Sequence, residues 1–125
     1  MRLLLDTHVF LWVMNDDSRL SRQARTLIED ASEVYVSSAS IWEIAIKSGL
    51  GKIKEDAQVV VDKLEAAGLK ELYVSNKHAI RAGKLQNLHK EPFDRLLVAQ
   101  AISELMRFVT ADEQLTAYSE LVVVI

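Results

Sequence analysis

Four acidic residues occupy similar positions in the chain, each standing where an apolar segment has just ended or a helix is expected to begin: Asp6, Glu43, Asp94 and Asp112. If the apolar segments are strands of a parallel sheet, their carboxyl ends meet at one edge and bring the carboxylates together. Each pair of carboxylates 4 Å apart would cost about 4 kcal/mol at an effective dielectric constant of 20. Such a pocket needs a divalent cation and suits metal-dependent phosphodiester chemistry.

Each carboxylate also has a structural explanation of its own. Asp6 could cap the helix that follows it, and Glu43 stands in the capping-box position after Ser40. Asp94 could cap a strongly apolar helix, and Asp112 could simply end a strand. Four such residues at the same kind of topological position favour a shared site over four separate caps.

The composition predicts a single domain over residues 1–125, because 125 residues with 50% hydrophobic content can bury a core without cross-links. There is no cysteine and there are only three histidines, so oxygen atoms must hold any metal. The net charge of −3 argues against coating nucleic acid by bulk electrostatics, and no glycine-rich loop follows a strand as dinucleotide binding would require. Asp6 and His8 interrupt the apolar start, so we expect a soluble, cytoplasmic protein.

Strands and helices are expected to alternate along the chain. The hydrophobic patterns predict strands at residues 2–5, 34–37, 71–74, 108–112 and 121–125. Helices are expected at residues 7–14, 22–31 with Ser21 as cap, after a cap at Ser40, at 56–67, at 76–82, from Asp94 onward and at 113–118. This order predicts an α/β fold, a three-layer α/β/α sandwich with a mostly parallel sheet.

Four segments carry a resemblance to a known family: LLLDTH at 3–8, SASIWEI at 38–44, HKEPFDRLLVAQA at 89–101 and VTAD at 109–112. In order and spacing they are similar to the signatures of PIN-domain ribonucleases, most of all the VapC-type toxins of bacterial toxin–antitoxin pairs. The resemblance covers the whole chain. It implies a Mg²⁺- or Mn²⁺-dependent endoribonuclease whose metal is bound through the four carboxylates, and it implies a homodimer inhibited by a small antitoxin protein.

The positions of individual residues suggest roles for them. Asp6 would be a central metal ligand, Asp94 would bind directly or through water, and Glu43 or Asp112 would orient or deprotonate the attacking water. Thr7 and Thr110 are expected to hydrogen-bond neighbouring carboxylates. Two positions depart from similar sequences. Glu91 stands where aspartate is common and is not assigned to the metal, and the choice between Glu113 and Gln114 as a further ligand stays open.

Nearby cations could hold the phosphates that flank the cleaved bond: Arg95, Lys47, Lys52 and Lys54. The lysines could equally form an ordinary solvated surface, and Arg95 could instead pair with Asp94 or Glu91. The histidines, His8 and His89 among them, are left out of the site because no nucleophile motif accompanies them. The apolar segment 9–13 is first of all a core helix, but part of it could receive an antitoxin helix. The alternative to an enzyme is a non-catalytic domain that uses the same acidic pocket to dock RNA or a protein.

Overall fold

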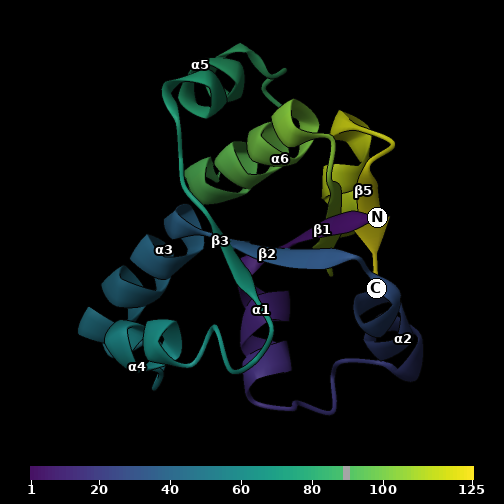
Figure 1. Cartoon of the computed structure of the whole chain (residues 1–125). Coiled ribbons are helices and arrows are strands. Elements are labelled where there is room, and N and C mark those ends of the chain that lie inside the picture. Colours follow the sequence, from purple (N-terminus) through teal and green to yellow (C-terminus); the bar gives the residue numbers. More distant parts are fainter. Residues whose placement is uncertain (89–90) are drawn as a thin grey trace.

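A five-stranded sheet forms the centre of the molecule in this computed structural model, which describes residues 1–88 and 91–125 (Figure 1). All four neighbouring strand pairs are parallel, and the strand order is β3-β2-β1-β4-β5. The strands are β1 (Arg2–Leu5), β2 (Glu33–Ser37), β3 (Lys70–Leu72), β4 (Arg107–Thr110) and β5 (Val122–Val124). The order reverses between β1 and β4, and ligands bind parallel α/β sheets at such a switch point.

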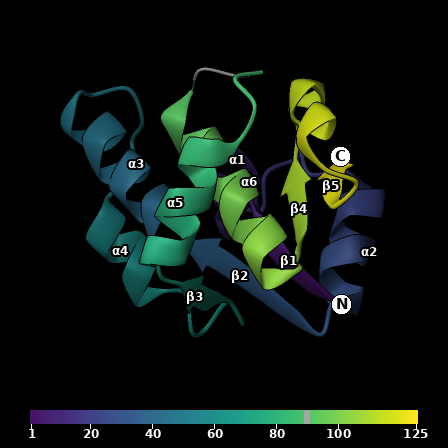
Figure 2. The ribbon, with the colours of Figure 1, turned by 90° about the horizontal axis from the view of Figure 1, so that it is seen from above.

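Helices cover both faces of this sheet. They are α1 (Thr7–Met14), α2 (Arg22–Asp30), α3 (Ser38–Gly49), α4 (Ala57–Asp62), α5 (Asn76–Lys84), α6 (Pro92–Glu104) and the 3₁₀ helix η1 (Glu113–Tyr118). Figure 1 shows α5 and α6 on one side of the sheet and α1, α2 and α4 on the other. In the perpendicular view, α5 and α6 lie side by side across the strands (Figure 2). The predicted α/β/α sandwich is therefore confirmed.

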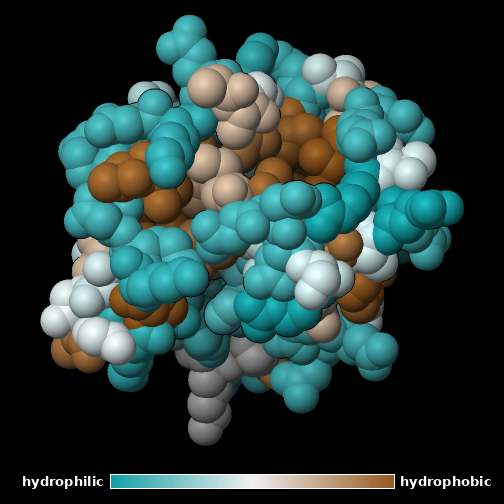
Figure 3. Space-filling view, turned by 90° about the horizontal axis from the view of Figure 1, so that it is seen from below, coloured by the Kyte–Doolittle hydropathy of each residue, from teal (hydrophilic) through white to brown (hydrophobic). Residues whose placement is uncertain are grey.

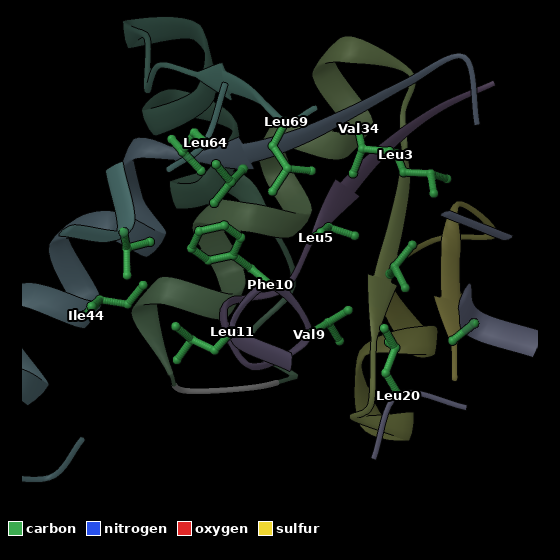
Figure 4. Packing of buried hydrophobic residues seen from close by; sticks show 14 residues of the cluster. Leu3, Leu5, Val9, Phe10, Leu11, Leu20, Val34, Ile44, Leu64 and Leu69 are labelled. Carbon is green, nitrogen blue, oxygen red and sulfur yellow. The ribbon is translucent and has the colours of Figure 1, made fainter. Parts of the chain in front are cut away.

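Alternating side chains of the strands feed two separate cores. Leu3 and Leu5 join the cluster beneath α1, where Phe10 is fully buried with leucines and valines of β1, β2, α4 and β4 (Figure 4). Leu4 and Phe108 point to the opposite face and pack under α6 and η1. Because β1 is covered on both faces, its three leucines form a continuous apolar run. Because its apolar residues are buried on both faces, β1 ends at Leu5, directly before Asp6.

The predicted strand positions are close to the observed ones. The strand expected at 71–74 begins one residue earlier and ends at Leu72, because the Val74 amide donates to the Ser38 hydroxyl at 3.1 Å. The helix expected at 56–67 ends at Asp62. The chain then turns through Gly68, whose φ of +77° favours glycine, and enters β3.

The caps predicted for two helices are wrong. The N-cap of α3 is Ser37, whose hydroxyl accepts from the Ala39 amide at 3.0 Å, so Ser40 lies inside the helix and Glu43 is not a capping-box residue. The helix expected to open at Asp94 begins at Pro92 instead, and Glu91 caps it. Both errors have the same source, since each helix starts two or three residues before its apolar pattern becomes regular. Among the residues that the structure describes, no helix combines the length and the apolar content needed to cross a membrane.

Candidate functional site

The four predicted carboxylates line one pocket of about 620 Å³ at the carboxyl end of the sheet. They come from four separate elements. Asp6 caps α1 directly after β1, and Asp112 caps η1 two residues after β4. Glu43 belongs to the middle of α3, and Asp94 to the first turn of α6. The remaining lining residues are His8, Trp12, Lys47, Glu91 and Ala111.

Asp6 is held more rigidly than a surface carboxylate would be. It is only 8% exposed, and its two oxygens accept hydrogen bonds from the Thr7 amide and the Thr110 hydroxyl, each at 2.7 Å. Its own amide donates to the Val109 carbonyl at 2.9 Å, which ties the residue to β4. Burial raises the pKa of Asp6, although the two hydrogen bonds oppose that shift. Burial disfavours the bare negative charge of Asp6. A metal cation bound to this carboxylate therefore offsets the same cost that protonation offsets.

Glu43 has a cation partner within its own helix. The Lys47 ammonium donates to one Glu43 oxygen at 2.7 Å, one helical turn away, and Glu43 is only 6% exposed. The hydrogen bond to Glu43 raises the pKa of Lys47, and the charges of Glu91 and Asp94 act in the same direction. Lys47 therefore points into the acidic pocket. Its predicted contact with substrate phosphate stays a prediction.

Glu91 positions the backbone that carries Asp94. Its carboxylate accepts from the Asp94 amide at 2.7 Å, as the N-cap of α6, and the Glu91 side chain also lines the pocket. The pocket therefore has five carboxylates, one more than the sequence analysis assigned to it. The motif stretch 89–101 includes His89 and Lys90, which lie outside the described residues.

The two threonines differ in what they contact. Thr110 connects two carboxylate positions, because its hydroxyl donates to Asp6 and accepts from the Asp112 amide at 3.1 Å. The Thr7 hydroxyl instead donates to Ser40 at 2.8 Å, and only the Thr7 backbone reaches Asp6. Thr7 thus joins α1 to α3, which differs from the carboxylate contact expected of its side chain.

The other predicted cations lie away from the pocket lining. Lys52 and Lys54 are exposed beyond the end of α3, and neither lines the pocket. The Arg95 guanidinium donates to the carbonyls of Ala82, Leu85 and Gln86 at 2.9–3.2 Å, and so holds the end of α5. The roles of these three residues in substrate binding stay predictions. Glu113 and Gln114 are exposed, and neither is among the lining residues.

Arg95→Ala is expected to destabilise the protein by about 1–2 kcal/mol, because three carbonyls at the end of α5 lose a charged donor. Urea unfolding followed by circular dichroism measures this change. Arg22→Ala is the matched control, because Arg22 is an exposed residue at the start of α2. Equal midpoints for the two variants would contradict the assigned role.

Sequence reasoning missed His8 and Trp12 as lining residues. Both lie on α1, four residues apart and therefore on one helical face, and His8 follows Asp6 by two positions. That spacing was the available signal. Trp12 is covered from outside by the Arg19 guanidinium, 5.2 Å from the ring centre, while Arg19 also pairs with Asp17. The pocket wall formed by α1 is therefore aromatic at Trp12, and the Arg19–Asp17 ion pair lies next to it, outside the lining residues.

The donor atoms of this pocket fit a hard divalent cation. All five acidic ligand candidates offer carboxylate oxygens, which Mg²⁺ and Mn²⁺ prefer, and burial of Asp6 already disfavours its bare negative charge. As they stand, no three acidic or histidine side chains within residues 1–88 and 91–125 converge closely enough to hold an ion. The cation that the pocket contains is the Lys47 ammonium. The chemistry of the donors fits, and binding requires the side chains to close on the ion.

The PIN-domain family model matches residues 3–121, so the chain belongs to the PIN-domain family. Among curated proteins it is similar to Ribonuclease VapC22 of Mycobacterium tuberculosis, with 28% identity over 122 residues that cover 93% of this chain and 91% of the relative. The family expected from the sequence motifs is thereby confirmed.

Solved structures agree on the fold. VapBC2 from Rickettsia felis, bound to a DNA fragment from its promoter, matches with a TM-score of 0.74 and 20% identity, covering 100% of this chain and 98% of that one. DNA-bound VapBC from Salmonella typhimurium gives 0.69 and 18% identity, covering 100% and 97%. A toxin–antitoxin complex from Klebsiella pneumoniae gives 0.66 and 18% identity, covering 97% and 95%.

Proposed function

We propose that this protein is a metal-dependent endoribonuclease and the toxin of a toxin–antitoxin pair. One observation carries the proposal: Asp6, Glu43, Asp94 and Asp112 line a single pocket at the switch point of a PIN-domain sheet. Four carboxylates drawn from four elements have no shared purpose as helix caps. The similarity to a protein named as a ribonuclease supports RNA as the substrate.

The positions of the carboxylates suggest that some bind the metal ion and others act on the attacking water. Asp6, fixed by Thr7 and Thr110, would be the central ligand for Mg²⁺ or Mn²⁺, and Asp94 and Asp112 would hold the same ion with it. The chemistry that a bound divalent ion supplies is an activated water and neutralisation of charge on the leaving oxygen. Glu43 or Asp112 accepts the proton of the attacking water. The net negative charge of the pocket favours the ion before the phosphodiester enters.

Partner binding is proposed on separate grounds. The similar structures include toxin–antitoxin complexes, and we propose a small antitoxin protein as the partner of this chain. Helix α1 leaves Trp12, Val13 and Met14 only partly buried against the core. Figure 3 shows the face that α1, α2 and α4 cover, where apolar side chains gather near the middle among hydrophilic ones. An apolar antitoxin segment fits this face. The expected homodimer stays a proposal.

The test is RNA cleavage by the purified protein during a Mn²⁺ titration, with product ends mapped. We expect cleavage to rise with Mn²⁺ and to stop with a chelator. Because water is the proposed nucleophile, products should lack a 2′,3′-cyclic phosphate, which attack by the ribose hydroxyl would leave. RNA binding without any metal-dependent product would overturn the enzyme in favour of a docking domain that uses the same pocket.

A further inference from the structure

Among the described lining residues of the pocket, one positively charged side chain is not used by the proposed reaction. Within residues 1–88 and 91–125, Lys47 is the single lysine or arginine that lines the pocket, together with five carboxylates. Its ammonium lies 2.7 Å from Glu43, and Glu91 and Asp94 are close enough to interact with it electrostatically. An ion pair one turn apart on an exposed helix contributes little. This pair is different, because Glu43 is 6% exposed and would otherwise be a buried, unpartnered charge.

The charges in the pocket show what this lysine does before any ion binds. Counting only the carboxylates and the ammonium of the described lining residues, five negative charges and one positive charge leave four negative charges. One divalent ion at Asp6 halves that charge. Glu43 is a poor ligand for a second ion. One of its oxygens already accepts a hydrogen bond from Lys47, so a second ion would have to displace the ammonium.

We propose that Lys47 is a positioning residue whose ammonium takes the place of a second metal, keeps Glu43 out of direct metal coordination and limits the pocket to one divalent ion. The inference rests on the proposed function, because it presupposes the ion at Asp6. It assigns Glu43 to the lysine and to the attacking water, and leaves Asp6, Asp94 and Asp112 as the direct ligands. The helical spacing makes this arrangement local to α3, so it is present before substrate arrives.

Counting bound ions tests the proposal directly. Free and bound Mn²⁺ are measured by electron paramagnetic resonance for the wild type and three variants of the full chain. Lys47→Met removes the charge at similar length, and we expect it to bind two Mn²⁺ ions per chain, the first on the order of tenfold more tightly than the wild type does. Lys47→Arg keeps a charged donor and should bind one ion. Lys52→Met loses the same charge outside the pocket and should also bind one.

The outcomes separate this inference from the proposed function. A Lys47→Met protein that keeps its native circular dichroism and binds a single Mn²⁺ overturns the inference, as does a wild type that binds two. A wild type that binds none overturns the proposed function along with it. If Lys47→Met does not fold, Lys47→Gln replaces it, because glutamine keeps a hydrogen-bond donor near Glu43 without the charge.

Discussion

Asp6→Asn is expected to lower the rate of metal-dependent RNA cleavage by at least about a hundredfold while the chain stays folded. Asparagine has the size of aspartate and keeps an oxygen for the Thr7 amide, so the start of α1 should hold its shape. It lacks the charge that makes Asp6 a metal ligand. Initial rates on one RNA substrate at saturating Mn²⁺, beside far-ultraviolet circular dichroism, measure both parts of the prediction.

The matched control is Asp30→Asn, which makes the same chemical change at the exposed end of α2. This variant should cleave like the wild type. A second, opposite effect accompanies the loss of activity. Because burial raises the pKa of Asp6, its charge destabilises the metal-free fold, and Asp6→Asn should unfold at a higher temperature than the metal-free wild type. Full cleavage by Asp6→Asn would remove Asp6 from the site.

Mn²⁺ is expected to raise the unfolding temperature of the wild type by about 10 °C when its concentration is one hundred times the dissociation constant. A ligand that binds only the folded chain stabilises it by about 2.7 kcal/mol at that ratio. Relief of the repulsion among five carboxylates tightens binding of the ion, so it lowers the Mn²⁺ concentration at which this shift is reached. Thermal unfolding with and without Mn²⁺ measures the shift.

The sign of the pH dependence follows from Asp6. The pKa of Asp6 in the folded protein lies above the ordinary pKa of an aspartate, so between those two values the folded chain binds more protons than the unfolded chain. The contribution of Asp6 to metal-free stability therefore falls as pH rises through this window, and the Mn²⁺-induced shift should grow over the same range. A shift of the same size in Asp6→Asn, or one that does not weaken in acid, would contradict a site built on Asp6.

The sequence was sufficient to predict the elements that carry the site. The strand at 2–5 was predicted with its observed bounds. Three consecutive leucines followed by an aspartate mark the end of a buried strand, and all three leucines are fully buried. Asp112 was expected as the last residue of a strand at 108–112, whereas β4 ends at Thr110 and Asp112 caps η1. The convergence of the four carboxylates on one pocket was expected from the parallel topology together with the family resemblance.

Side-chain partners could not be predicted in the same way. The sequence pattern predicted Ser40 as the cap of α3, but the extended backbone at Ser37 starts the helix three residues earlier. Lys47 was expected either to hold a substrate phosphate beside the pocket or to belong to an ordinary solvated surface, and its pairing with Glu43 was not expected. The buried Glu43 carboxylate draws the Lys47 ammonium into the pocket. Glu43 is buried because α1 and α6, which are distant from α3 in the sequence, pack beside α3.

The order in which the pocket residues occur along the chain also bears on synthesis. Asp6 comes early, but its hydrogen-bond partner Thr110 and the pocket residue Asp112 come more than one hundred positions later. Strand β4, which carries Thr110, pairs with β1 in the sheet. Until β4 is made, this edge of β1 is therefore unpaired. A nascent chain still attached to the ribosome and lacking β4 therefore has no assembled pocket, and any activity that needs all four carboxylates is withheld from the machinery that is making the protein.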